Sequence, residues 1–203
     1  MLIRIHPEDP QPRLIKQVAE CLRDGGVIIY PTDTIYGIGC NIFNAAAIER
    51  IARIKQVDSQ KMQLSFVCSD LSDLSKYARQ IDTPTYRILK HHLPGPYTFI
   101  LHASKEVPKL LQTKKHHIGL RVPDNRIAQA IVEELGHPIL SASLPGDRAE
   151  EYCDPELIKD RFDLLADAVI DGGTGGMIPS TIIDLTSGEP ELIRQGKGEW
   201  ELV

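Results

Sequence analysis

The sequence has few cysteines, few aromatic residues and no long apolar run. Its 203 residues include four cysteines without a Cys-x-x-Cys pair, which disfavours a disulfide framework or zinc site and favours free thiols in a reducing compartment. No apolar stretch approaches the roughly 18 residues that cross a membrane, and the N-terminus lacks the apolar core of a signal peptide. We therefore expect a cytoplasmic protein without membrane contact.

Familiar catalytic signatures are missing too. The glycine-rich stretch Asp171 to Gly176 lacks the Gly-Lys-Ser/Thr ending and the following helix of a P-loop, so we interpret it as a mobile loop or turn. The adjacent histidine pairs at 91–92 and 116–117 would point apart on a helix or strand, which disfavours a metal site. The chain has no Ser-His-Asp or Cys-His signature, so covalent catalysis is not indicated.

Composition is that of an ordinary soluble protein, and the length fits a single domain over residues 1–203. The net charge of −5 gives no global attraction to nucleic acid. Residues 105–126 are an exception, because they hold six basic and two acidic residues, a net charge of +4. That segment is either a solvated surface or an anion-binding rim for the phosphates of a nucleotide or RNA.

Hydrophobic periodicity predicts alternating helices and strands. Helical spacing of apolar residues predicts helices over 11–24, 45–54, 83–89 and 126–135. Apolar or alternating runs predict strands over 27–30, 64–68, 97–102, 118–122, 139–141, 168–170, 181–185 and 191–194. Because helices and strands alternate early and strands cluster late, we expect an α/β domain with a mixed sheet.

Residues 26–40 carry the most chemistry. A buried strand over 27–30 ends at Pro31, and polar side chains follow at Thr32, Asp33, Thr34 and Tyr36, with glycines at 37 and 39. Ligands of open α/β sheets bind outside the carboxyl ends of strands, so this turn is a candidate wall of a small-molecule site. The glycines would allow unusual backbone angles or close approach to a ligand. An ordinary polar turn is the alternative.

Five later segments follow this one in a fixed order: Pro94-Gly95-Pro96-Tyr97-Thr98, Gly119-Leu120-Arg121-Val122-Pro123, Ile139-Leu140-Ser141-Ala142-Ser143, Ser180-Thr181-Ile182-Ile183-Asp184-Leu185 and Ile193-Arg194-Gln195-Gly196. Together the six resemble the YrdC/Sua5 family of threonylcarbamoyl-adenylate synthases, in particular its YciO branch, from about residue 11 to about residue 196. The resemblance implies a twisted open mixed sheet, with helices on its faces, around a basic cavity.

The resemblance also implies a reaction. Family enzymes combine ATP, L-threonine and bicarbonate into threonylcarbamoyl-adenylate and pyrophosphate, and the product modifies an adenosine of certain tRNAs. Catalysis would come from positioning and charge neutralisation. Mg²⁺ would arrive with ATP, held by phosphates and water, so we expect no metal site built from protein side chains.

By the same resemblance, three residues belong to the threonine side, namely Thr34, Arg121 and Thr181. Five fall where the family contacts ATP, namely Lys55, Thr98, Ser141, Ser143 and Arg194. Four further candidates are Thr32, Tyr36, Lys61 and Ser180. Read alone, Arg121 could equally form a surface ion pair, Thr98 and Ser141 could bond to strand backbone, and Tyr36 could be core packing.

The chain departs from the family tetrad, which is Lys-x-Arg with Ser-x-Asn. Here Val57 replaces the arginine and Ser143 replaces the asparagine. A charge-assisted contact is worth about 1.5–3 kcal/mol, so ATP use would fall about 10- to 100-fold from the arginine alone. Lys61 could restore some positive charge, without the guanidinium fork. Residues 195–203 are too few for the extra C-terminal domain of longer Sua5 enzymes.

Three interpretations remain. The chain is a threonylcarbamoyl-adenylate synthase-like nucleotidyltransferase, a related adenylate-forming or hydrolytic enzyme with another carboxylated substrate, or a non-catalytic protein that binds double-stranded RNA, tRNA or rRNA through the same basic cavity. We favour an enzyme because the threonine-side positions match the family. Salt separates the last interpretation from the others, since RNA binding weakens steeply with salt.

Overall fold

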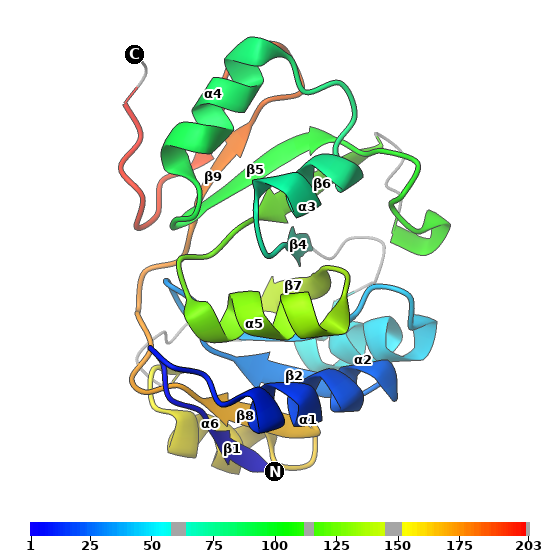
Figure 1. Cartoon of the computed structure of the whole chain (residues 1–203), viewed down its shortest axis with the longest axis vertical. Coiled ribbons are helices and arrows are strands. Elements are labelled where there is room, and N and C mark those ends of the chain that lie inside the picture. Colours follow the sequence, from blue (N-terminus) through cyan, green and yellow to red (C-terminus); the bar gives the residue numbers. More distant parts are fainter. Residues whose placement is uncertain (58–63, 112–115, 145–151, 202–203) are drawn as a thin grey trace.

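A computed structural model describes residues 1–57, 64–111, 116–144 and 152–201. In these residues a single ten-stranded open sheet runs through the molecule in the order β1-β8-β2-β3-β7-β4-β6-β5-β9-β10 (Figure 1). The sheet is mixed: β8 lies parallel to β1 and β2, whereas β3 lies antiparallel to β2 and β7. The expected α/β fold with a twisted mixed sheet is therefore confirmed.

The strands are β1 (Leu2–Arg4), β2 (Val27–Tyr30), β3 (Gly37–Asn41), β4 (Ser65–Val67), β5 (Tyr97–His102), β6 (His117–Arg121), β7 (Ile139–Ser143), β8 (Ala168–Asp171), β9 (Thr181–Asp184) and β10 (Glu191–Arg194). The helices are α1 (Pro12–Arg23), α2 (Ala45–Lys55), α3 (Leu71–Tyr77), α4 (Thr83–His92), α5 (Arg126–Leu135) and α6 (Pro155–Phe162), with a short 3₁₀ turn η1 (Lys109–Leu111). None of the described helices is both long and apolar enough to cross a membrane.

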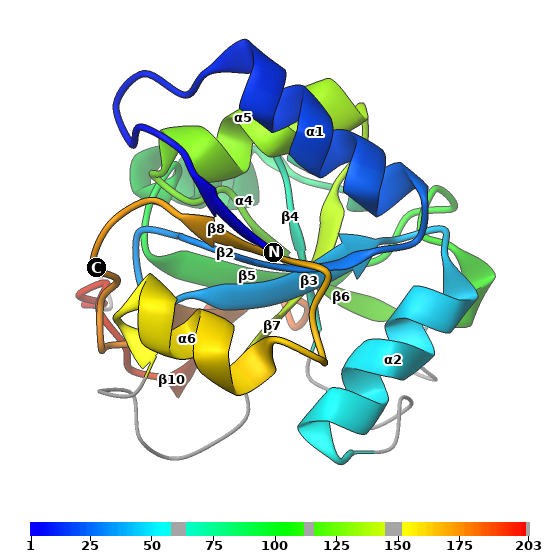
Figure 2. The ribbon, with the colours of Figure 1, turned by 90° about the horizontal axis from the view of Figure 1, so that it is seen from below.

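Helices cover both faces of the part of the sheet that lies lowest in Figure 1. Figure 2 shows α1 and α5 side by side on one face, and α2 and α6 on the opposite face. The first pair buries residues such as Leu22 and Ile131 against Ile28 of β2, while α2 packs Ile51 on the other side, in the same core as Ile38 of β3. Burial on both faces explains why the central strands read as continuous apolar runs.

The two ends of α2 determine where Lys55 lies. Asn44 caps α2, its side chain accepting a hydrogen bond from the backbone N–H of Ala47. The helix ends at Lys55 because Gln56 has a left-handed backbone with φ of 54°. Lys55 therefore lies where the helix stops, close to the end of β7.

Two parts of the fold differ from the sequence expectations. Gly37–Asn41, expected as a turn, is strand β3, because it pairs with β2 on one side and β7 on the other. Because two of its five residues are glycines, β3 lacks the alternation of side chains that predicts a strand. The short elements β1, α3 and α6 were also not predicted.

Candidate functional site

Strands from both halves of the sheet converge on one cavity that encloses about 90 Å³. Eight of the predicted site residues line it: Thr32, Tyr36, Thr98, Arg121, Ser141, Ser143, Ser180 and Arg194. They come from the turn after β2, from β5, β6, β7 and β10, and from the residue that precedes β9. None of the described residues that line the cavity is acidic. The enclosed volume is below the roughly 300–1,000 Å³ of typical ligand pockets, so it suits a small substrate or one end of a larger one.

Arg121 is the most buried cation of the cavity, only 8% exposed. Its Nη2 donates to Thr34 Oγ1 at 2.7 Å and to Thr32 Oγ1 at 3.3 Å, and it forms an ion pair with Asp33. The buried Nε has no hydrogen-bond partner among the described residues. An unpaired buried donor is costly, so this side of the guanidinium is suited to a ligand oxygen.

Asp33 is a site residue that the sequence did not assign to a role. Its Oδ1 pairs with Arg121 and its Oδ2 accepts from the backbone N–H of Asp124 at 3.1 Å. Lys197 donates to the backbone oxygen of Asp33 at 2.6 Å, which ties the C-terminal segment to the same turn. The only feature of the sequence that pointed to Asp33 was its position between two threonines. Its partners, Arg121 and Asp124, are distant along the chain.

The turn after β2 is held from behind by the glycine-rich stretch. The Tyr36 hydroxyl donates to the carbonyl of Gly173 at 2.7 Å and accepts from the N–H of Gly172 at 3.3 Å. Gly176 donates to the carbonyl of Thr34 at 2.8 Å, so close that a Cβ there would overlap the Thr34 backbone. Burial raises the pKa of Tyr36 to about 12, so the phenol stays neutral at ordinary pH. The glycines thus brace the wall of the cavity.

A second cation, Arg194, lines the same cavity. Its Nε and Nη2 both donate to the carbonyl of Ser180, at 3.2 and 2.8 Å. The hydroxyls of Ser180 and Thr98 are 2.9 Å apart. The pKa of Arg194 is lowered, first by burial and then by the charge of Arg121, so the two guanidinium groups repel each other across the cavity. An anion between them would relieve this repulsion.

Lys55 stands at the cavity's edge rather than in its lining. Its Nζ donates to the carbonyl of Ser143 at 2.5 Å, and burial lowers its pKa. Val57, at the position of the family arginine, is 41% exposed and makes this edge less basic. Lys61, the proposed substitute charge, lies outside the described residues.

Thr34 and Thr181 do not line the cavity. Thr34 is fully buried, and its hydroxyl accepts the hydrogen bond from Arg121. The Thr181 hydroxyl donates to the carbonyl of Gly198 and accepts from the N–H of Gly196 at 2.9 Å, so it holds the C-terminal segment. A direct contact of Thr181 with threonine stays a prediction.

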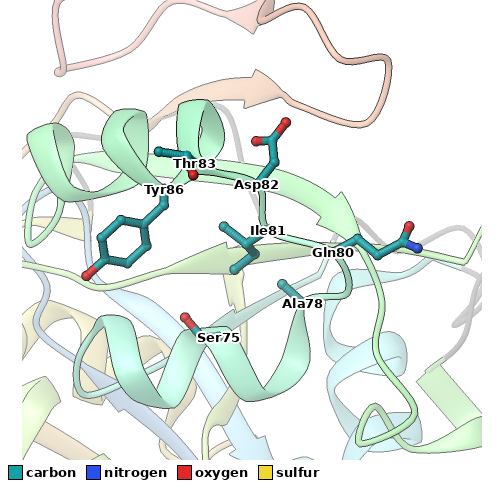
Figure 3. A pocket seen from close by; sticks show the side chains of 7 residues that line it. All are labelled: Ser75, Ala78, Gln80, Ile81, Asp82, Thr83 and Tyr86. Carbon is teal, nitrogen blue, oxygen red and sulfur yellow. The ribbon is translucent and has the colours of Figure 1, made fainter.

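A second hollow is larger but chemically different. It lies between α3 and α4 and encloses about 470 Å³, with Ser75, Asp82 and Tyr86 among its lining residues (Figure 3). Asp82 is its only charged lining residue, and this carboxylate is already used as the N-cap of α4. The hollow therefore lacks the cations that a nucleotide or carboxylate site needs. No group of three or more metal-ligating side chains gathers among the described residues.

Comparisons with known proteins show the family of the chain. The family model Sua5_yciO_yrdC, described as Telomere recombination, matches residues 20–196. The Escherichia coli K12 protein named "Uncharacterized protein YciO" is 50% identical over 198 residues, covering 96% of this chain and 95% of that protein. The crystal structure of E. coli YciO has a TM-score of 0.90 and covers 98% of this chain and 97% of that one.

Two more distant relatives carry functional names. The threonylcarbamoyl-AMP synthase of Chromobacterium violaceum is 34% identical over 184 residues, covering 90% of this chain and 94% of the synthase. The crystal structure of P. abyssi Sua5 complexed with L-threonine has a TM-score of 0.86 at 28% identity, covering 97% of this chain and 57% of that one. Similarity thus extends from YciO to proteins named as synthases.

Proposed function

The chain belongs to the Sua5/YciO/YrdC family, and we propose that it is a nucleotidyltransferase that forms threonylcarbamoyl-adenylate, or a related acyl-adenylate, from ATP, L-threonine and bicarbonate. Its product would serve tRNA modification, and it would act as one domain over residues 1–203. Support comes from relatives named threonylcarbamoyl-AMP synthase and from the threonine complex of P. abyssi Sua5.

The observation that carries the proposal is a pair of arginines facing one small cavity without an acidic lining residue. Arg121 has a buried Nε without a partner among the described residues, and Arg194 has a pKa lowered by burial and by Arg121. Such a cavity stabilises negative charge, which fits a substrate carboxylate at Arg121 and a phosphate near Arg194.

The residues would act by positioning. Arg121 would bind the carboxylate of threonine while Thr34 and Asp33 hold its guanidinium in place. Ser141 and the Thr98–Ser180 pair would offer hydroxyl groups to the nucleotide. Lys55 would lie at the edge, where its ammonium could turn from Ser143 to a phosphate. Because no acidic residue lines the cavity among those described, Mg²⁺ would be held by phosphate oxygens and water.

RNA binding is the alternative, and the basic segment 105–126 gives it little support. Arg121 is buried in the cavity and paired with Asp33, and Arg126 pairs with Glu8 at 3.6 Å. Lys114 and Lys115 lie outside the described residues. Two of the six basic residues are therefore already paired with carboxylates, which weakens the case for a continuous anion-binding rim.

The test is pyrophosphate release from ATP with Mg²⁺ and bicarbonate, with and without L-threonine. Threonine-dependent release, with threonylcarbamoyl-adenylate identified by mass spectrometry, would support the synthase. Release that depends on a different carboxylate would point to the related acyl-adenylate. If folded protein releases nothing and instead binds tRNA or double-stranded RNA with a steep salt dependence, the enzyme proposal is wrong.

A further inference from the structure

Tyr30 is buried next to the cavity, and no part of its side chain lines it. It is the last residue of β2, it is fully buried, and it does not line the cavity. Its hydroxyl donates a 2.7 Å hydrogen bond to the Oγ of Ser141, which does line the cavity. The Tyr30 phenol, which cannot contact a ligand, is therefore hydrogen-bonded to the Ser141 hydroxyl, which can.

The contact spans an intervening strand. Tyr30 is on β2 and Ser141 is on β7, and β3 lies between them. The Tyr30 ring crosses β3 where that strand has glycines, since a Cβ at Gly39 would be 3.0 Å from a ring carbon and a Cβ at Gly37 would be 3.1 Å from Ser141 Oγ. These distances are tighter than ordinary Cβ contacts, so a side chain at either glycine would force the ring or the serine to shift.

The direction of the hydrogen bond determines what Ser141 can do. The Tyr30 hydroxyl donates to Ser141 Oγ, and because burial raises the pKa of Tyr30 to about 12 the phenol keeps the proton that it donates. Ser141 Oγ accepts this hydrogen bond, and no acceptor for its own hydrogen is found among the described residues. A hydroxyl that accepts one hydrogen bond becomes a better donor of the next. Its hydrogen is thus available to a ligand oxygen in the cavity.

We propose that Tyr30 is a positioning residue, which fixes Ser141 as a hydrogen-bond donor to an anionic oxygen of the nucleotide. The inference rests on the proposed function, and it adds a residue that would act through Ser141 without contacting substrate. The alternative is that Tyr30 and Ser141 only satisfy each other's polar groups, which would affect stability alone.

A double-mutant cycle distinguishes the two roles. Affinity for ATP with Mg²⁺ is measured by calorimetry for wild type, Tyr30→Phe, Ser141→Ala and the double variant, and thermal unfolding is recorded for each. We expect Tyr30→Phe to weaken ATP binding about 3- to 10-fold and to have no further effect once Ser141 is alanine. L-threonine affinity should stay unchanged in Tyr30→Phe.

The matched control is Tyr77→Phe, which removes the hydroxyl group of a buried tyrosine on α3, outside the cavity lining. It should leave ATP affinity unchanged. If Tyr30→Phe lowers the melting temperature but not ATP affinity, or if its effect adds fully to that of Ser141→Ala, the positioning role is wrong. If wild-type protein binds neither ATP nor threonine, the proposed function fails and this inference falls with it.

Discussion

Arg121 and Asp33 form a buried ion pair that occupies only one end of the guanidinium group. Asp33 pairs with Nη2, whereas Nε is buried without a partner among the described residues. Both side chains are about one-tenth exposed, at 10% and 9%. The carboxylate therefore holds the guanidinium in place, while Nε keeps a donor that a ligand oxygen could use.

Asp33→Ala should destabilise the fold strongly. Removal of one partner from a buried pair leaves an uncompensated charge, which costs about 3–5 kcal/mol of unfolding free energy. Urea unfolding measures this loss. Asp124→Ala is the control, because Asp124 is exposed and only its backbone N–H reaches Asp33. Equal stability of the two variants would show that the ion pair does not stabilise the protein.

Arg121→Ala should weaken amino-acid binding and spare ATP. The loss of charge-assisted hydrogen bonds predicts an L-threonine affinity about 10- to 100-fold lower. Arg121→Lys should be intermediate, since lysine keeps the charge but lacks the planar fork. Calorimetry on folded variants, with Arg126→Ala as a surface control, checks this. An equal loss of both ligands would refute the assignment of Arg121 to the amino-acid side.

Restoring the family tetrad should raise activity. Val57 is 41% exposed, so an arginine can replace it without being forced into the core. Val57→Arg with Ser143→Asn should increase ATP-dependent pyrophosphate release about 10- to 100-fold. Leu157→Arg on α6, also an exposed apolar position, controls for added charge. If the double variant behaves like wild type, these two departures do not limit turnover.

Gly176→Ala should disturb the cavity through the backbone. Its methyl group would overlap the carbonyl of Thr34, so the turn that carries Thr34 must shift. We expect lower stability together with weaker threonine binding. Gly188→Ala is the comparison, because Gly188 has open space around it and a φ of 91°, so only backbone strain of about 1 kcal/mol should appear. Unchanged threonine affinity in Gly176→Ala would argue against a bracing role for the glycine stretch.

Alkaline pH should weaken the fold through its buried phenols. Burial raises the pKa of Tyr30, Tyr36 and Tyr77 from 10.0 to about 12. The folded state keeps these protons longer than the unfolded state, so their stabilising contribution is complete below pH 10 and is lost as pH rises towards 12. Urea midpoints measured across this window should fall, and less steeply in Tyr30→Phe. A flat profile would contradict the raised pKa values.

Sequence patterns predicted most of the sheet because its central strands are apolar runs. They failed at β3, where Gly37 and Gly39 carry no side chains to form a pattern, although both are buried between two strands. Eight of the residues predicted from the family motifs line one cavity in the structure. The motifs could not reveal Asp33 as the partner of Arg121, because the two are 88 residues apart and ion pairing depends on the folded sheet.

The Thr181 hydroxyl is engaged within the protein, and its predicted contact with threonine stays a prediction. The motif predicted it on the substrate side, yet its hydroxyl is engaged by Gly196 and Gly198 of the following segment. Which of two neighbouring hydroxyls faces a cavity depends on strand register and on the path of a later loop. Ser180, one residue earlier, lines the cavity instead.

The order of strands in the sheet bears on how the protein reaches its native state. The cavity wall joins Thr32, early in the chain, to Arg194, near its end, through strands that are not neighbours in sequence. Contacts with such large sequence separation form slowly, because loop-closure entropy is lost before they can stabilise the chain. Acquisition of ligand affinity should therefore be among the last events of refolding, later than the recovery of helical circular dichroism.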